Sequence, residues 1–205
     1  MKPAAAAPKA APRAAAPAAP PLPPDPPPPA DLAPPAFIQA VVEAFPGIQL
    51  SVWVGDWTII TGRDRLIDLV TFLRDAPATR FDYCADLTAI DWPARPEARF
   101  DLVYCLYSTT RRHRVRVKTH AGEADPVPSV TGIWASANWL EREVFDMFGV
   151  RFARHPDLRR ILMPEDWQGH PQRKDYPLEG PGELILESPQ AWLKLEQAAE
   201  ESGIE

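Results

Sequence analysis

The residue types best suited to chemistry lie between residues 138 and 178, where acidic, basic and histidine side chains occur close together. Glu143 and Asp146 are three residues apart on a predicted helix, so they are expected to share one face. Paired carboxylates of this kind bind metal ions or exchange protons, and His155 follows nearby. A carboxylate-metal enzyme that uses these three residues is therefore one hypothesis for this chain.

The same stretch lacks the spacings that known metal and catalytic motifs require. It has no Glu-x-x-His unit of a di-iron bundle, and prolines separate His155 from His170, so the two cannot pair on one helix. No glycine-rich phosphate-binding loop and no Gly-x-Ser-x-Gly elbow occurs anywhere in the chain. Cys84 and Cys105 are too few for an iron–sulfur cluster and are predicted to be buried, reduced thiols. We therefore expect no metal, cofactor or catalytic residue in this chain.

Large apolar side chains are interleaved with these charges, which an ordinary solvated segment does not need. The aromatic members are Trp139, Phe145, Phe148, Phe152, Trp167 and Tyr176. Arginine side chains offer fixed forks for carboxylates and backbone carbonyls, a geometry suited to contacts between chains. The pattern predicts a segment that is buried against something, such as another chain.

The elements that must position these residues begin with two helices and a hairpin. Apolar residues at helical spacing predict helices over 31–45 and 63–75. Alternating apolar residues predict a strand over 48–54, and Gly55-Asp56 turns the chain back into a hairpin partner over 57–61.

Two further strands are predicted before residue 120. Residues 100–108 are apolar on both faces, which favours a central strand, and residues 112–118 alternate as a half-exposed strand does. The basic residues of 112–118 are interpreted as a solvated face, because no aromatics interleave with them for base stacking. Residues 81–91 mix apolar residues with three aspartates and give no clear period.

The chemically rich stretch itself is predicted to be a helix followed by irregular chain. Ser129 is a suitable N-cap for a helix over 130–148, single or broken into two, and Gly149 is a suitable C-cap. Beyond it, repeated prolines forbid any long regular element; they are Pro156, Pro164, Pro171, Pro177, Pro181 and Pro189. The predicted fold class is α+β, a small mixed or antiparallel sheet with packed helices, followed by a long extended C-terminal segment. Residues 151–205 are named the C-terminal strap.

The predicted α+β domain occupies residues 36–150, preceded by a Pro/Ala-rich arm over residues 1–35. The arm holds 14 of the 26 prolines together with 13 alanines, too little apolar surface to offset the entropy of ordering. It is therefore predicted to be disordered and partly polyproline. A mitochondrial transit peptide is the alternative, although serine is absent and the only basic residues are Lys2, Lys9 and Arg13.

Charge and hydropathy narrow the function classes further. Residues 179–205 hold seven glutamates against Lys194 alone, so this tail accounts for the whole formal charge of −6. The remaining chain is near neutral, which argues against nucleic acid as a partner. No apolar run reaches the length of a membrane span, and no secretory signal is present.

The charged stretch carries a string of motifs that resembles one known family. The motifs are Glu141-Arg142-Glu143, Phe145-Asp146-Met147-Phe148-Gly149, His155-Pro156-Asp157-Leu158-Arg159-Arg160-Ile161-Leu162, Pro164-Glu165-Asp166-Trp167, Gly169-His170-Pro171 and Arg173-Lys174-Asp175-Tyr176-Pro177, with Pro128-Ser129-Val130-Thr131 upstream. So long a string is far more specific than a short motif. It resembles the 30 kDa subunit family of the proton-pumping NADH:quinone oxidoreductase, respiratory complex I.

The resemblance implies a structural subunit of a complex rather than an independent enzyme. In that family the chain lies in the hydrophilic arm and packs on the large subunit beside the quinone pocket, which is of the 49 kDa type. The complex passes electrons from NADH through FMN and iron–sulfur clusters to quinone and drives proton transport, so these cofactors are expected in partner subunits. The alternative function is an equivalent subunit of a membrane-bound hydrogenase-type complex.

The resemblance also implies a location and a set of contact residues. The chain is expected at the cytoplasmic side of a bacterial inner membrane, associated with the membrane only through the complex, with the matrix side of the mitochondrial inner membrane as alternative. The signature residues are expected at the partner interface: Glu141, Arg142, Glu143, Asp146, Gly149, His155, Pro156, Arg159, Arg160, Trp167, His170, Arg173, Lys174 and Asp175.

Overall fold

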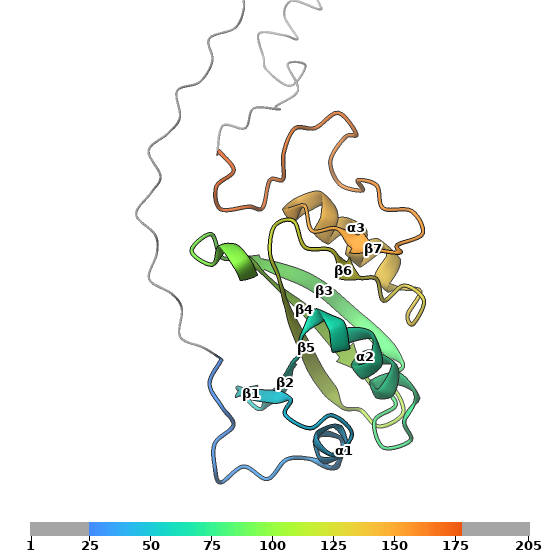
Figure 1. Cartoon of the computed structure of the whole chain (residues 1–205). Coiled ribbons are helices and arrows are strands. Elements are labelled where there is room, and N and C mark those ends of the chain that lie inside the picture. The colour runs from blue at the N-terminus through green and yellow to red at the C-terminus, as the bar shows by residue number, and fades with distance from the viewer. Residues whose placement is uncertain (1–24, 178–205) are drawn as a thin grey trace, which may run out of the picture.

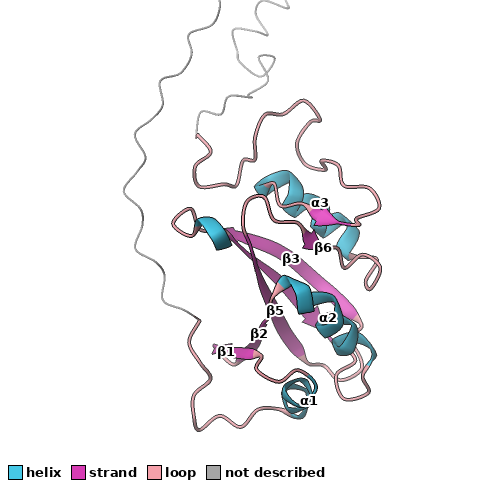
Figure 2. Ribbon diagram, in the orientation of Figure 1, coloured by secondary structure: helices cyan, strands magenta, loops and turns pink. Residues whose placement is uncertain are grey.

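The structure is a computed structural model that describes residues 25–177. The arm predicted to be disordered over residues 1–35 lies outside the described residues as far as residue 24, and so does the acidic tail from residue 178. The described chain forms one five-stranded mixed sheet with three α-helices, which lie on one side of the sheet (Figures 1 and 2). The predicted α+β class is therefore confirmed. Within residues 25–177 no helix is both long and apolar enough to cross a membrane.

The five-stranded sheet has the order β1-β2-β5-β4-β3. Its strands are β1 (Gln49–Trp53), β2 (Asp56–Ile60), β3 (Tyr83–Asp91), β4 (Phe100–Tyr107) and β5 (Arg114–Ala121). All neighbours are antiparallel except β2 and β5, which pair in parallel. The predicted hairpin is β1–β2, and β4 is interior as its apolar sequence predicts. The stretch without a clear period, 81–91, is largely the edge strand β3, which has a bulge between Cys84 and Asp86.

Two helices close the sheet on the side that carries its buried residues. Helix α1 (Ala36–Ala44) buries Phe37, Ile38 and Val41, and α2 (Leu66–Asp75) follows the 3-10 turn η1 (Arg63–Arg65). The helix expected from residue 31 begins at Ala36, because each residue that precedes a proline in Pro34-Pro35 is pushed out of the helical region. Both helices pack on alternate residues of the strands, which form the hydrophobic core.

Helix α3 (Ala137–Phe148) is shorter than predicted. The expected helix over 130–148, with Ser129 as N-cap, is wrong in its first part. The carbonyl of Val130 accepts the N–H groups of both Ile133 and Trp134, at 2.9 and 3.0 Å, and forms a turn instead. The Trp134 ring is buried, and its Nε1 donates to the Phe81 carbonyl at 3.1 Å, which holds the turn against the core.

The C-terminal strap begins inside the domain. Its residues Phe152–Ala153 form β7, which pairs in parallel with β6 (Val127–Pro128) in a second, two-stranded sheet. From residue 154 to 177 the described chain has neither helix nor strand, in agreement with its prolines, and it loops over α3 (Figure 1). The strap therefore covers the helix that carries the charged motifs.

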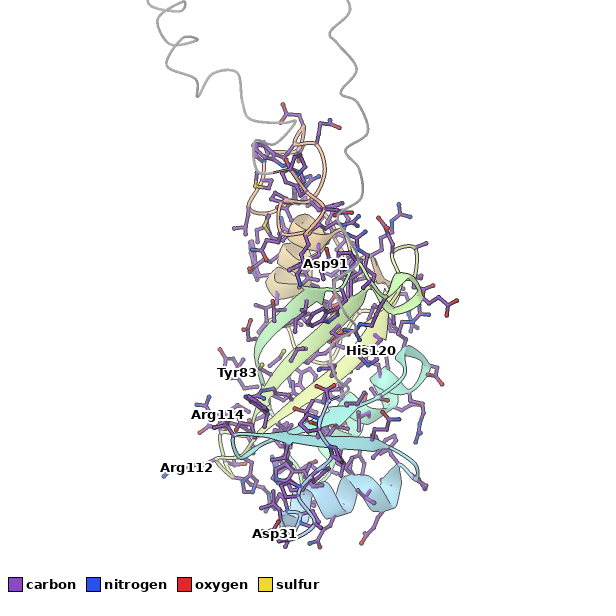
Figure 3. All side chains as sticks on the ribbon, turned by 90° about the vertical axis from the view of Figure 1, so that its left-hand side faces the viewer. Asp31, Tyr83, Asp91, Arg112, Arg114 and His120 are labelled. Carbon is purple, nitrogen blue, oxygen red and sulfur yellow. The ribbon has the colours of Figure 1, made fainter. Side chains whose placement is uncertain are left out.

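Cross-strand pairing gives the main sheet an inner and an outer face. The inner face carries buried residues such as Leu102, Tyr104 and Val117 and meets the helices. The outer face, toward which Figure 3 looks, carries Tyr107 and Arg114 among others. A short 3-10 turn, η2 (Pro96–Ala98), joins β3 to β4.

Candidate functional site

Three charged residues of α3 are buried, and these are the centre of the candidate site. Glu141 and Asp146 are fully buried, and Arg142 is 9% exposed. Burying a charge is costly unless it is paired or hydrogen bonded. The hydrogen-bond and ion-pair partners of each side chain therefore show which segments of the chain α3 binds.

The Asp146 carboxylate organises the first turn of the loop that covers α3. Its Oδ2 accepts the N–H groups of Ile161, Leu162 and Met163, at 3.0, 2.8 and 2.9 Å. Its Oδ1 pairs with Arg160 Nη1 at 2.5 Å. These hydrogen bonds lower the pKa of Asp146 against the opposing effect of burial, so the side chain is an ionised structural anchor.

Arginine side chains bind backbone carbonyls on both sides of this loop. Arg160 Nη2 donates to the carbonyls of Trp167 and Gly169, at 3.0 and 2.9 Å. Arg142 donates to the carbonyls of Arg159 and Arg160, at 3.1 and 2.9 Å. The guanidinium groups therefore replace the ladder hydrogen bonds that irregular, proline-rich chain cannot make for itself.

Glu141 and His155 form a second buried contact, toward the sheet. Glu141 Oε1 accepts the Val130 N–H at 2.7 Å, and its Oε2 lies 3.9 Å from His155 Nε2. His155 Nδ1 accepts the Asp157 N–H at 3.0 Å, so the ring hydrogen is on Nε2, which donates to the Asn138 carbonyl at 3.2 Å. Burial raises the pKa of Glu141 to about 7, with Ser129 and the Val130 N–H acting in the opposite direction.

The end of the described strap is attached to the main sheet through Arg99. This arginine binds both oxygens of Asp91, at 2.7 and 3.1 Å, and also Asp175 and Glu123, at 2.8 and 3.2 Å. The backbone N–H of Lys174 donates to Asp91 at 2.8 Å, and Lys174 Nζ lies 4.5 Å from the centre of the Trp92 ring.

The C-terminal end of α3 is the third attachment. Arg173 Nε donates to the Phe148 carbonyl at 2.5 Å, which occupies a helix-end carbonyl. His170 Nδ1 donates to the Asp146 carbonyl at 2.9 Å, and burial lowers the pKa of His170, so the neutral ring is favoured. Gly149 has φ +77°, as predicted for a C-cap, and its Cα faces both side chains.

The side chains of the remaining signature residues take no part in these contacts. Glu143, Pro156 and Arg159 are exposed, and the Arg159 ion pair with Asp157 lies at the surface. Trp167 is half-buried, and its Nε1 is buried without a hydrogen-bond partner within residues 25–177.

The carboxylate-metal hypothesis is wrong for the geometry of this site. Glu143 is exposed while Asp146 is buried, so the two carboxylates do not converge, and His155 contacts Glu141 instead. Asp146 already accepts three N–H groups and an arginine. Within the described residues, 25–177, no group of three His, Cys, Asp or Glu side chains is placed to hold a metal ion.

The sequence interpretation missed the residues on the sheet that receive the strap. Asp91, Arg99 and Glu123 lie far from the motifs in sequence and carry no spacing signal of their own. Cys84 is buried and free as predicted, whereas Cys105 is only half-buried because it lies on the outer face.

The comparison with known families decides what this buried charge arrangement belongs to. Residues 59–182 match the family described as "Respiratory-chain NADH dehydrogenase, 30 Kd subunit". The chain belongs to this family. It is therefore a structural subunit of the peripheral arm of the NADH:quinone oxidoreductase complex. Its partners are other subunits of that complex. The hydrogenase-type alternative is not favoured.

Curated relatives agree with the family. The NADH-quinone oxidoreductase C subunit of Geobacter sulfurreducens is 48% identical over 128 residues, which cover 62% of this chain and 78% of the relative. The protein of the same name from Caulobacter vibrioides is 49% identical over 143 residues, which cover 69% of this chain and 72% of the relative.

Two solved structures share the fold. The trypsin-resistant fragment (1–134) of Nqo5 is 32% identical, with a TM-score of 0.53, covering 60% of this chain and 99% of that fragment. A chain of the membrane-bound sulfane sulfur reductase, an archaeal respiratory membrane complex, is 23% identical, with a TM-score of 0.60, covering 79% and 89%. This second likeness concerns the fold alone.

Proposed function

We propose that this chain packs on the large subunit beside the quinone pocket, the 49 kDa type, and holds it in position without taking part in the chemistry. The observation that carries the proposal is the internal use of the signature charges. Asp146 and Arg142 of α3 bind the strap, and Arg160 of the strap pairs with Asp146, so these charges shape a surface. The domain over residues 36–150 builds the platform, and the strap over 151–205 presents the contact surface to the partner.

Exposed apolar side chains support a partner on this side of α3. Trp139 is 62% exposed and Leu162 is 60% exposed. The Arg142 guanidinium lies 5.0 Å from the centre of the Trp139 ring, which fixes the ring in an exposed orientation. Exposed Trp and Leu side chains beside a rigid charged network are suited to a protein interface. Glu143, Pro156 and Arg159 are exposed on the same segments and are proposed as polar contacts at its rim.

The cofactors and the location follow from the same proposal. FMN and the iron–sulfur clusters belong to partner subunits, and the chain reaches the cytoplasmic side of a bacterial inner membrane only through the complex. The buried carboxylates support this division of labour, because they are engaged in holding the strap.

Co-purification tests the proposal directly. The full chain is tagged, membranes are solubilised in mild detergent, and all co-purifying chains are identified. We expect a large assembly with flavin, iron–sulfur clusters and NADH:quinone activity, and cross-links from a photoreactive residue at Trp139 to the large quinone-pocket subunit. An assembly with a nickel-iron subunit and no NADH activity would instead support the hydrogenase-type function. A solitary chain would contradict both.

A further inference from the structure

One end of the outer sheet face carries a row of aromatic side chains. Cross-strand pairing places Trp53 opposite Asp56, Tyr83 opposite Tyr107, and Tyr107 opposite Arg114. Trp53 is 64% exposed and Tyr83 is 48% exposed. We use the name aromatic row for Trp53, Tyr83 and Tyr107. Figure 3 shows Tyr83 and Arg114 near each other on the face that looks away from the helices.

A hollow of about 180 Å³ runs beside the aromatic row. Asp56, Cys105, Tyr107 and Arg114 are among its lining residues. The Arg114 guanidinium lies 5.4 Å from the centre of the Tyr107 ring and holds it in place. The row is therefore a shaped surface with fixed ring orientations.

The hairpin tip beside Trp53 carries an exposed apolar residue, Val54, in a strained backbone conformation. Val54 is 88% exposed and has φ +52°, and Gly55 follows with φ +84°. A β-branched residue is disfavoured in this left-handed region, where Asn or Gly is the usual choice. Val54 therefore extends the exposed apolar surface beside Trp53, and strained residues of this kind are frequent at binding sites.

The N-terminal arm is attached to this same face. The Asp25 carboxylate binds Lys118 Nζ through both oxygens, at 2.6 and 2.8 Å, and the Lys118 side chain is only 12% exposed. Lys118 and Arg114 lie on the same face of β5, four residues apart. At a rise of about 3.3 Å per residue, Asp25 fixes the arm about 13 Å from the row.

The arm has the length and composition to reach and follow the row. Polyproline II chain advances about 3.1 Å per residue, so four or five residues cover the gap to Arg114 on the central strand β5. About three more reach Tyr83, which lies two strands away at about 4.8 Å per strand. Residues 14–24 meet this requirement. They include Pro17, Pro20, Pro21, Pro23 and Pro24.

We propose that residues 14–24 of this chain dock on the aromatic row as a polyproline II segment. Aromatic-lined surfaces recognise such segments because proline rings stack on aromatic faces and the extended helix is preformed, with little entropy left to lose. The proposed occupant of the aromatic row is therefore a segment of the same chain. The proposal is independent of which subunit packs on the strap.

Photo-cross-linking in the assembled complex tests the proposal. The full chain carries benzoylphenylalanine in place of Tyr83, membranes are irradiated, and cross-linked peptides are mapped by mass spectrometry. We expect links to residues 14–24. The matched control carries the same group at Val42, which is 44% exposed on α1, and should give no links to the arm.

A second variant separates docking from simple tethering through Asp25. Serine replaces the five prolines of residues 14–24, which leaves the length of the arm unchanged. We expect the yield of arm cross-links from position 83 to fall about two- to tenfold, the range that aromatic contacts contribute. An unchanged yield overturns the proposal, as does the absence of arm links.

Links from position 83 to another subunit or to a second copy also overturn the proposal and identify the row as an interface between chains. Co-purification of the complex with this tagged chain is scored separately. Loss of assembly would count against the proposed subunit role, while an assembled complex without arm links would count against arm docking alone.

Discussion

At the scale of single residues, Glu141 is the buried acid with the fewest compensating contacts. One oxygen accepts the Val130 N–H, and the other has no hydrogen-bond partner within residues 25–177. The charge of Glu141 raises the pKa of the buried Tyr104 and Cys84, for both of which burial itself is the larger cause. Cys84 of β3 and Tyr104 of β4 therefore lie near the same carboxyl group that His155 of the strap contacts.

The raised pKa of Glu141 predicts a pH-dependent stability of the fold. The unfolded acid ionises near 4.5 and the folded one at about 7, so the folded state retains a proton that the unfolded state loses. Stability is greatest below pH 4.5 for this group and falls as pH rises to 7, by about 3 kcal/mol in total. We expect Glu141→Gln to remove this decline, measured as the free energy of urea unfolding at about pH 5 and about pH 7.5, on either side of the folded pKa.

Glu143→Gln is the matched control, because Glu143 lies on the same helix and is exposed. It should keep the pH dependence of the unmodified chain. An identical decline in the Glu141→Gln chain would show that other groups cause it.

The sequence drew attention to these acidic residues but did not indicate which of them are buried. Glu141, Glu143 and Asp146 look alike as a cluster of acids, and only the path of the strap decides that two are buried and one is exposed. Spacing along a helix gives the angle between side chains. It does not say which faces another segment will cover, and here the strap and β3 cover two faces.

At the scale of elements, Gly149 connects the end of α3 to the strap. Its φ of +77° is the left-handed C-cap conformation. A Cβ atom added there would lie 2.5 Å from Arg173 Nη2 and from the His170 ring. Both side chains cap carbonyls of α3, so neither moves freely away.

We expect Gly149→Ala to destabilise the chain more than Gly47→Ala does. Gly47 also has φ +77° but has no atom within 4 Å of an added Cβ. The control therefore bears only the left-handed strain of about 1–2 kcal/mol, while Gly149→Ala adds a steric clash. Thermal unfolding followed by circular dichroism measures both. Equal losses of stability in the two variants would mean that the Arg173 and His170 side chains move aside without destabilising the fold.

Asp146 holds the strap through backbone groups, which makes its effect visible by hydrogen exchange. In Asp146→Asn the charge that binds Arg160 and three N–H groups is lost. Breaking a buried pair costs about 3–5 kcal/mol, so exchange at Ile161, Leu162 and Met163 should accelerate about a hundredfold or more.

The amides of β4 provide the internal control, because that strand is interior to the sheet. They should exchange at the unmodified rate. Uniform acceleration across the chain would instead indicate global unfolding, and no change at residues 161–163 would show that the strap is held by other contacts.

Local elements were predictable where periodicity is strong, and long-range ones were not. The hairpin, α2 and the C-cap of α3 follow from residues adjacent in sequence. The turn over 131–134 depends on Trp134 reaching the Phe81 carbonyl, and the strap depends on Asp91 and Arg99. Contacts between residues that are far apart in the sequence produce no periodic pattern from which they could be predicted. The long motif string provided the family because it combines many positions at once.

At the scale of the whole molecule, the described part of the strap is a clasp, attached to the domain at two places. The Arg160–Asp146 pair attaches it to α3, and the Arg99–Asp175 pair attaches it to the main sheet near residue 177, where the described chain ends. The exposed Leu162 lies between these attachments. If the proposed partner packs on this side of α3, its contact surface depends on both attachments.

Arg160→Ala is the variant that tests this dependence of docking on the clasp. Arg160 neutralises the buried Asp146 and satisfies the carbonyls of Trp167 and Gly169. Without it a buried carboxylate loses its counter-charge, at a cost of about 3–5 kcal/mol, and the loop around Leu162 loses its shape. We expect less assembled complex in membranes, with normal NADH:quinone turnover for each complex that remains; Arg142→Ala should act in the same direction.

Arg159→Ala separates this structural effect from a general loss of positive charge. Arg159 is the neighbouring residue, its side chain is 63% exposed, and its ion pair with Asp157 lies at the surface, where such pairs contribute little. We expect near-normal abundance of the complex in this variant. Abundance is measured by native gel electrophoresis and turnover by the NADH-dependent reduction of quinone. Normal abundance with low turnover in Arg160→Ala would place this residue in the chemistry of the complex, because a clasp that acts only through docking changes the number of complexes and not their rate.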